Sequence, residues 1–305
     1  MSENFPTVLP ERFRQNAFRR GVGRGEKWLR DLPALIGELK ADWNLRRVDG
    51  PFPNLSYHYV APCLLADGGE AVLKIGLPEE ETDLLTGAEF LRSSDGCGAV
   101  RLLRADDERT ALLMERVSPG RDLKEVFAGD EPKALSAAIA LFQKLPRSLP
   151  PKNFSFPSLE RWFGDLEKAR NTIFPREAVK KTRRIFDELC ADPDPLYLLH
   201  GDLHHENILS AGNGEFLAID PKGVIGKRGY EAAVFLNNHA DWILDAPDHP
   251  LQLKAAVERF SKTFEMEPPT LKKWALIQQI LAAWWSFEDR EENWRSQMER
   301  AEIWE

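Results

Sequence analysis

Cysteine, histidine and long apolar runs are all scarce in this chain of 305 residues. The 3 cysteines are widely spaced and odd in number. This pattern argues against a disulfide framework and indicates reduced thiols in a cytoplasmic protein. No apolar run approaches the roughly 20 residues that cross a bilayer. The charged N-terminal segment also lacks the continuous apolar stretch of a secretory signal. We therefore expect no membrane partner.

The chain also lacks an excess of positive charge, because its formal net charge is −8. That balance argues against nucleic acid as a partner, since phosphate binding requires a basic face. It is compatible with a cationic small molecule, although many proteins are this acidic for solubility alone. Apolar residues occupy 43% of positions and include 9 tryptophans, which is ample material for a folded core.

Hydrophobic patterning divides the chain into a strand-rich first part and a helix-rich second part. Strand patterns fall at 57–65, 70–75, 100–103 and 110–117, with helical patterns at 28–39 and 82–93. After Pro119-Gly120, helical patterns follow near 135–145, 159–166, 179–189, 230–244, 250–265 and 270–300. We predict an α+β, two-lobed architecture. Residues 1–117 form a small β-rich lobe with an N-terminal helical extension, and residues 118–305 form a larger helical lobe.

The segment from 200 to 220 is the most informative. It contains Asn213-Gly214 between two apolar runs, which is a strong hairpin signal. With this pair at the centre of a two-residue turn, Asn207 falls directly opposite Asp220 and both side chains point to one face. An amide oxygen and a carboxylate placed in this way suit Mg²⁺, which completes its octahedron with water and phosphate oxygens.

Asp202 lies just before this hairpin, in the spacing His-x-Asp-x-x-x-x-Asn. In the catalytic loop of kinases that aspartate accepts the proton of the attacking hydroxyl and the asparagine holds metal. A lone aspartate is more often a turn residue. The ordered set of Asp202, Asn207 and Asp220 with a hairpin between them favours phosphoryl transfer.

Phosphoryl transfer also needs a cation on the phosphates, and Lys74 supplies one from the middle of an apolar strand. A charge in that position requires a partner. Glu89 on the following helix is the expected counter-ion, so that a Lys74–Glu89 pair would position the α- and β-phosphates. The alternative is an edge-strand lysine that reaches solvent, with Glu89 on an exposed helix face.

Four segments carry a resemblance to a known family. They read Val-Leu-Lys-Ile from Val72, Leu-Leu-Met-Glu-Arg-Val-Ser-Pro-Gly from Leu112, His-Gly-Asp-Leu-His-His-Glu-Asn-Ile-Leu from His200 and Ala-Ile-Asp-Pro-Lys-Gly-Val-Ile-Gly from Ala218. Together they resemble the aminoglycoside phosphotransferase family, in particular its branch of streptomycin kinases and hydroxyurea phosphotransferases. The resemblance extends over nearly the whole chain.

This resemblance implies a protein-kinase-like fold and phosphorylation of a small-molecule hydroxyl with ATP and Mg²⁺. It makes Asp202 the catalytic base, Asn207 and Asp220 the magnesium ligands, and Lys74 with Glu89 the phosphate-binding pair. The segment from Met114 to Val117 would be the hinge, where backbone groups of Glu115 and Val117 meet adenine.

Two positions depart from the family pattern. The loop from Pro53 to Tyr57 replaces a glycine-rich loop, and its Ser56 is a candidate phosphate contact. Glu231 stands where this branch has aspartate, so its helix is expected to be anchored differently.

The implied acceptor is a cationic hydroxylated small molecule, streptomycin or a related aminoglycoside, and the activity would inactivate an antibiotic. A kinase of hydroxyurea or another metabolite remains an alternative, as does a catalytically degenerate binding module. A metallohydrolase built on Asp202, His204 and His205 is disfavoured, because only 6 histidines are present and the others lack neighbouring ligands.

Overall fold

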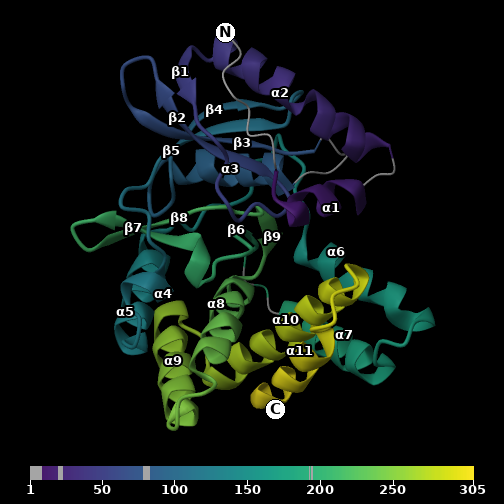
Figure 1. Ribbon diagram of the computed structural model, residues 1–305. Coiled ribbons are helices and arrows are strands. Elements are labelled where there is room, and N and C mark those ends of the chain that lie inside the picture. Colours follow the sequence, from purple (N-terminus) through teal and green to yellow (C-terminus); the bar gives the residue numbers. More distant parts are fainter. Residues whose placement is uncertain (1–8, 20–22, 78–82, 192, 194) are drawn as a thin grey trace.

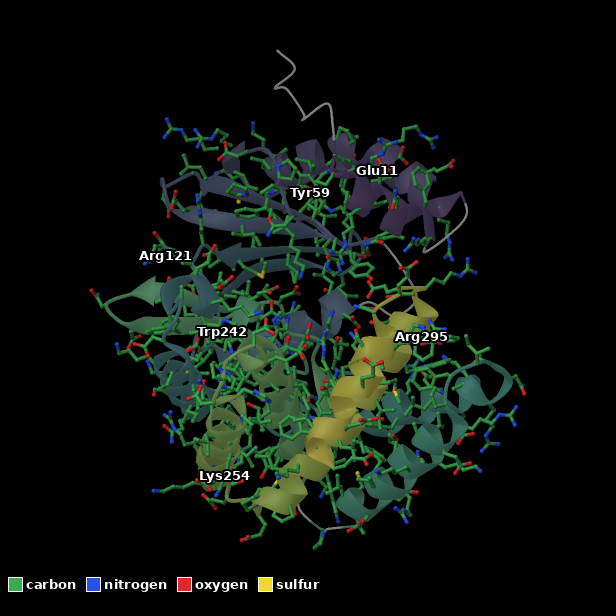
Figure 2. The ribbon with its side chains drawn as sticks, turned by 60° about the horizontal axis from the view of Figure 1, so that its bottom comes forward. Glu11, Tyr59, Arg121, Trp242, Lys254 and Arg295 are labelled. Atoms are coloured by element: carbon green, nitrogen blue, oxygen red, sulfur yellow. The ribbon has the colours of Figure 1, made fainter. Side chains whose placement is uncertain are left out.

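The computed structural model of the chain describes residues 9–19, 23–77, 83–191, 193 and 195–305. A sheet with flanking helices forms one part, and a larger bundle of helices forms the other (Figure 1). Glu11 and Tyr59 lie in the sheet-containing part, and Lys254 lies at the far end of the helical part (Figure 2). The two-lobed α+β prediction is therefore confirmed.

The N-terminal lobe is built on one antiparallel sheet with the strand order β1-β2-β3-β5-β4. Two helices precede the sheet and a third lies between β3 and β4. The elements are α1 (Glu11–Arg19), α2 (Arg24–Asp42), β1 (Leu45–Val48), β2 (Tyr59–Leu65), β3 (Glu70–Ile75), α3 (Asp83–Ser94), β4 (Leu102–Asp106) and β5 (Ala111–Glu115).

Side-chain alternation in the central strand β3 positions the lysine of interest. Ala71, Leu73 and Ile75 pack into the core formed with α1 and α2. Because successive strand residues point to opposite faces, Lys74 must point to the other side of the sheet, toward the helical lobe. Only 7% of its side chain is exposed.

The C-terminal lobe is mainly helical, with two small antiparallel sheets that pair β6 with β9 and β7 with β8. Its elements are α4 (Leu123–Val126), α5 (Glu131–Lys144), α6 (Leu159–Gly164), the 3₁₀ helix η1 (Asp165–Asn171), α7 (Arg176–Cys190), β6 (Tyr197–Leu199), η2 (His205–Asn207), β7 (Ile208–Gly212), β8 (Glu215–Ala218), β9 (Val224–Gly226), α8 (Arg228–Ile243), α9 (His249–Phe264), α10 (Pro268–Glu288), α11 (Trp294–Ala301) and η3 (Glu302–Trp304).

Most predicted elements are present, but the helix expected over 270–300 is two helices. The break between Glu288 and Trp294 coincides with a run of charged residues from Glu288 to Glu292, which offers no apolar side chain to continue the buried stripe. Arg290 lies there in the left-handed region, with φ 60°. Helix α1 and strand β1 were not predicted. Thr82, the expected first residue of the helix 82–93, lies outside the described residues.

The large hydrophobic core does not end at the predicted lobe boundary. Leu84 and Leu91 of α3 and Met114 of β5 belong to the same buried cluster as the helices of the C-terminal lobe. The division at residue 117 stays a prediction. All 3 cysteines are free, as expected. Within the part of the chain that is described, no helix combines the length and apolar character needed to cross a membrane.

Candidate active site

The buried lysine of β3 and the aspartate after β8 meet between the two lobes. Lys74 lies between Val60 and Leu112 of the neighbouring strands, and its ammonium forms an ion pair with the Asp220 carboxylate. Burial alone would raise the pKa of Asp220, but Lys74, Lys222 and His58 outweigh it and hold that pKa well below its ordinary value. The sequence places these two residues 146 positions apart, and the fold brings their charges into contact.

Asp202 lies on the loop between β6 and η2, where its backbone is fixed from several sides. Its N–H donates to His200 Nδ1 at 3.3 Å, and its carbonyl accepts hydrogen bonds from the backbone N–H of His204 and from Asn207 Nδ2. Burial raises the pKa of the carboxyl, Lys222 and His204 oppose that rise, and Asp220 adds to it. The structure therefore brings Asp202 and Asp220 into electrostatic reach of one another.

The hairpin register differs from the prediction by one residue. Gly212 pairs with Glu215, as a turn centred on Asn213-Gly214 requires, but Ser210 pairs with Phe216, whereas the same turn would place it opposite Leu217. A bulge between Ser210 and Gly212 inserts one residue into β7 and shifts every pair beyond it. The carbonyl of Asn207 consequently accepts a hydrogen bond from Ile219, not from a residue at 220. The predicted cross-strand opposition of Asn207 and Asp220 is wrong.

Asp220 instead leaves the strand through a turn. Its backbone is left-handed, with φ 58°, so the chain turns sharply immediately after β8. Asn207 is buried, its amide nitrogen donates to the Asp202 carbonyl at 2.8 Å, and the same nitrogen lies 3.1 Å from His204 Nε2. The bond to Asp202 orients the amide, and among the described residues the amide oxygen has no hydrogen-bond donor, so it can serve another ligand.

The donor chemistry of this site fits a magnesium ion. An amide oxygen and a carboxylate are hard ligands, and two protein oxygens suit a cation that keeps water and takes phosphate oxygens. Among the described residues, no group of three or more histidine, cysteine or acidic side chains could hold a metal by itself. A softer metal with a complete protein ligand set therefore has no site in that part of the chain.

The expected ion pair between Lys74 and Glu89 is not formed in this structure. Glu89 instead pairs with Arg92, one turn further along α3, while the Lys74 ammonium is engaged by Asp220. The cause is local, because a cation three residues away on the same helix face is always within reach. A nucleotide-binding role for Glu89 stays a prediction.

The loop that contains Ser56 is held by hydrogen bonds at two adjacent residues, Ser56 and Tyr57. Asn16 of α1 donates a hydrogen bond to the Ser56 carbonyl at 3.0 Å, and the Tyr57 hydroxyl donates one to Asp289 at the end of α10 at 3.1 Å. Sequence reasoning missed the contribution of α1, which holds this loop through the hydrogen bond of Asn16. The phosphate contact of the Ser56 side chain stays a prediction.

The proposed hinge follows β5. The Glu115 carboxylate accepts hydrogen bonds from the backbone N–H and the Nε of Arg101, at 2.7 and 3.1 Å. Its side chain is thereby committed to the N-terminal lobe, and its backbone N–H donates to the Arg101 carbonyl at 3.0 Å, so the Glu115 carbonyl and the backbone of Val117 are the groups expected to meet a nucleotide base. Their adenine contact stays a prediction.

Glu231 was noticed in the sequence only as a departure, and the structure gives it a definite position. Its buried carboxylate accepts hydrogen bonds from the backbone N–H groups of His200 and Gly201, at 2.7 and 3.0 Å. The neutral His200 ring bridges the same loop, because Nδ1 accepts from Asp202 and Nε2 donates to the Ile219 carbonyl at 2.9 Å. Helix α8 therefore anchors the loop that carries Asp202.

This anchor predicts a pH-dependent stability. Burial raises the pKa of Glu231 to about 7, although the two N–H donors oppose the rise. Between the ordinary value of 4.5 and about 7 the folded state holds more protons than the unfolded state, so stability falls as pH rises through this window. The loss attributable to Glu231 is about 3 kcal/mol once both states are ionised.

Urea unfolding of the natural protein and of Glu231→Gln at about pH 5 and about pH 8 tests this expectation. Burial also lowers the pKa of His200 to about 3, which raises stability as pH increases toward 6.5, but this contribution is common to both proteins. The substitution should therefore cost less stability at the higher pH. Parallel pH profiles for the two proteins would show that Glu231 does not titrate in this way.

Lys222 is a second residue that the sequence reasoning left without a role. Its ammonium lies 3.2 Å from Asp83 at the start of α3, and its backbone N–H donates to the His200 carbonyl at 2.7 Å. The Ile219–Gly223 pattern had marked this segment only as typical of one family branch, which was the available signal.

The histidines do not form a hydrolase site. His205 and His239 are both buried and their ring nitrogens approach to 3.4 Å, a contact that the sequence did not indicate. They stack on Phe235 and lie edge-on to Trp242 in the C-terminal lobe, where Figure 2 labels Trp242. Burial lowers the pKa of both rings, so they remain neutral and pack as aromatic side chains.

Comparison with known proteins agrees with this geometry. Residues 46–290 match the family described as aminoglycoside/hydroxyurea antibiotic resistance kinase. Streptomycin 6-kinase of Streptomyces griseus is 30% identical over 301 residues, covering 95% of this chain and 94% of that protein. Hydroxyurea phosphotransferase of Kitasatospora aureofaciens is 31% identical over 241 residues, covering 75% of this chain and 68% of that protein.

A solved structure supports the fold. One such structure is a thermostable mutant of the aminoglycoside phosphotransferase APH(4)-Ia in ternary complex with ADP and hygromycin B. It superposes with a TM-score of 0.58 at 11% identity, and the superposition covers 88% of this chain and 96% of that chain. At that identity the similarity shows the protein-kinase-like fold alone. With the family match over most of the sequence, it follows that this chain belongs to the aminoglycoside/hydroxyurea antibiotic resistance kinase family.

Proposed function

We propose that this protein transfers the γ-phosphoryl group of ATP to a hydroxyl of a cationic small molecule, most simply streptomycin or a related aminoglycoside. The observation that carries the proposal is the convergence of Lys74, Asp202 and Asp220 between the lobes. A relative named as a streptomycin kinase spans nearly the whole chain. The free cysteines and the use of ATP fit a cytoplasmic enzyme.

Each side chain then has a distinct task. Asp202 accepts the proton of the attacking hydroxyl, and the hydrogen bonds to its backbone hold its carboxylate in place. Asn207 and Asp220 would hold Mg²⁺, which neutralises charge on the β- and γ-phosphate oxygens when bound. Lys74 would move from Asp220 to the α- and β-phosphates. Positioning and electrostatics of this kind require no covalent intermediate.

The surroundings of the loop favour a cationic acceptor over neutral hydroxyurea. Trp162 lies next to Gly201 and packs edge-on against Trp285 of α10, with ring centroids 5.3 Å apart. One turn further along α10, burial raises the pKa of Glu288, Lys168 opposes that rise, and Asp165 and Asp289 add to it. This group of acids has an excess of negative charge, and the contacts of Trp285 with Trp162 and of Trp162 with Gly201 connect it to the catalytic loop. We assign this side of the loop to the acceptor.

The acidic residues of α8 and of the end of α10 divide into two sets. Asp241 is paired with Arg300 at 2.6 Å, and Glu291 accepts a hydrogen bond from Ser286 at 3.2 Å, so both serve the fold. Glu288 and Asp289 are the acids that we assign to acceptor binding. Asp289 also accepts a hydrogen bond from the Tyr57 hydroxyl, which connects the acceptor side to the loop that contains Ser56.

Replacing Asp289 with asparagine should raise the KM for a cationic acceptor about 5- to 10-fold and leave the KM for ATP unchanged, because one attractive charge is removed without loss of volume. Steady-state kinetics with each substrate varied separately measure both values. Glu292→Gln is the matched control, since it removes the charge of an exposed acid from the same segment without loss of volume. An equal effect of the two substitutions would contradict the assignment of Asp289.

The function itself is tested by incubating the protein with Mg²⁺, ATP and separate acceptors, followed by mass spectrometry of each acceptor. Streptomycin should gain one phosphate and hydroxyurea should not. A phosphorylated hydroxyurea with unchanged streptomycin would favour the alternative represented by the hydroxyurea relative. Binding of magnesium and ATP with no phosphorylated acceptor would favour the degenerate binding module.

A further inference from the structure

Lys222 is held by its backbone at the junction of three segments. Its N–H donates to the His200 carbonyl in the catalytic loop, and its carbonyl accepts a hydrogen bond from the Thr86 hydroxyl of α3. The next residue, Gly223, has φ +65°, and a Cβ there would lie 2.2 Å from the Thr86 carbonyl. Only glycine permits this close approach, so the main chain at Lys222 is fixed between α3 and the catalytic loop.

The side chain of Lys222 lies among the carboxylates of the site. Its nearest partner is Asp83, 3.2 Å away, and 28% of the lysine side chain is exposed. Among the charges that act on Asp202, Lys222 is the strongest that favours ionisation. It also acts on Asp220, where only Lys74 contributes more among the neighbouring charges. The main chain agrees with this, because Lys222 follows Asp220 by two positions and its Cβ lies 3.3 Å from the position that a Cβ on Gly201, the neighbour of Asp202, would take.

That arrangement has a consequence for the transferred group. In the proposed reaction the γ-phosphorus would lie between the attacking hydroxyl at Asp202 and the phosphate oxygens near the magnesium that Asn207 and Asp220 would hold. A cation that acts on both carboxylates lies beside this path. The contact with Asp83 does not remove it from the site, because 48% of the Asp83 side chain is exposed and the pair can open at little cost.

We propose that Lys222 is a further catalytic residue, whose ammonium contacts the equatorial oxygens of the γ-phosphoryl group as it passes to the acceptor. The inference rests on the proposed function and assigns to this site a lysine that lies outside the catalytic loop from His200 to Asn207. Lys74 would bind the α- and β-phosphates, which remain in ADP, and Lys222 would bind the γ-phosphoryl group, which is transferred.

The chemical step balances without any further reactant. The acceptor oxygen forms a bond to the γ-phosphorus, and the bond from that phosphorus to the bridging β-phosphate oxygen breaks with its electron pair remaining on ADP. The acceptor proton passes to Asp202. Lys222 keeps its protons and stabilises the negative charge spread over the three equatorial oxygens.

The competing explanation is that Lys222 only fastens α3 to the catalytic loop through Asp83. Two single substitutions separate these roles, because Lys222→Met and Asp83→Asn both break the same ion pair but only the first removes the cation. We expect Lys222→Met to lower kcat about 100-fold or more. Asp83→Asn should stay within about threefold of the natural protein, and Lys222→Arg should recover part of the rate.

A binding measurement provides a second readout that does not depend on turnover. Calorimetry with Mg²⁺ and ADP, with and without aluminium fluoride as a mimic of the transferring phosphoryl group, should show a tighter complex when fluoride is present. Lys222→Met should lose at least about tenfold of that gain and keep its affinity for ADP. Asp83→Asn should keep both.

The outcomes are distinct. Equal losses of rate and of aluminium fluoride binding in Lys222→Met and Asp83→Asn would assign Lys222 a purely structural role and overturn the proposal. Natural-like behaviour of Lys222→Met, in a protein whose natural form phosphorylates streptomycin, would overturn the proposal and leave the proposed function intact. A natural protein that phosphorylates no acceptor would overturn both.

Discussion

Replacing Asp202 with asparagine is expected to lower kcat about 1,000-fold while leaving the affinity for magnesium and ATP nearly unchanged. The reason is that the substitution removes the proton acceptor but not the loop geometry. Every hydrogen bond that fixes this residue to His200, His204 and Asn207 uses its backbone N–H or carbonyl. The loop should therefore keep its shape around an uncharged amide.

Initial rates with streptomycin and calorimetric titration with magnesium and ATP measure the two quantities separately. Asp245→Asn is a matched control, because it removes an exposed aspartate from the same lobe. If Asp202→Asn instead lost ATP binding and kept its turnover per bound ATP, Asp202 would be a nucleotide ligand and not the base.

Replacing Asp220 with alanine should have the second large effect, on nucleotide binding. The substitution removes a carboxylate that would ligate Mg²⁺, so the affinity for magnesium and ATP should fall about 100-fold, or about 3 kcal/mol. It also leaves the Lys74 ammonium, with 7% of its side chain exposed, without its partner. The variant should consequently melt at a lower temperature, because an unpaired buried charge is costly.

Titration of ATP at several magnesium concentrations tests this expectation at a temperature where the variant is folded. Nucleotide affinity should rise with magnesium in the natural protein and change little in Asp220→Ala. Asp220→Asn serves as the comparison, since it keeps a neutral oxygen ligand and should give an intermediate response. An unaltered magnesium dependence in the alanine variant would assign the metal to other ligands.

The sequence predicted those parts of the site that depend on local order. The structure confirms that Asp202 and Asn207 share one loop and that Lys74 lies inside an apolar strand. Both features depend on residues close together in the sequence and not on distant contacts. The two lobes were also predictable, since strand and helix periodicities differ along the chain. Hydrophobic alternation in β3 explains why Lys74 faces the helical lobe.

Contacts that depend on geometry beyond the local pattern were predicted less well. A bulge near Ala211 changes the register of β7, and nothing in the hydrophobic pattern of the sequence indicates it. Asn207 and Asp220 are therefore not directly opposed. Glu89 had two possible cations, and the nearer one, Arg92, determines its pairing. The attachment of Glu231 to the backbone of His200 and Gly201 links segments that are about 30 residues apart.

The most direct test of the account is a crystal structure of the complex with Mg²⁺, a non-hydrolysable ATP analogue and streptomycin. We expect the metal on the oxygens of Asn207 and Asp220, Lys74 on the α- and β-phosphates, and one streptomycin hydroxyl within hydrogen-bond distance of Asp202. A nucleotide bound away from Lys74, or an acceptor whose hydroxyls all lie out of reach of Asp202, would contradict it.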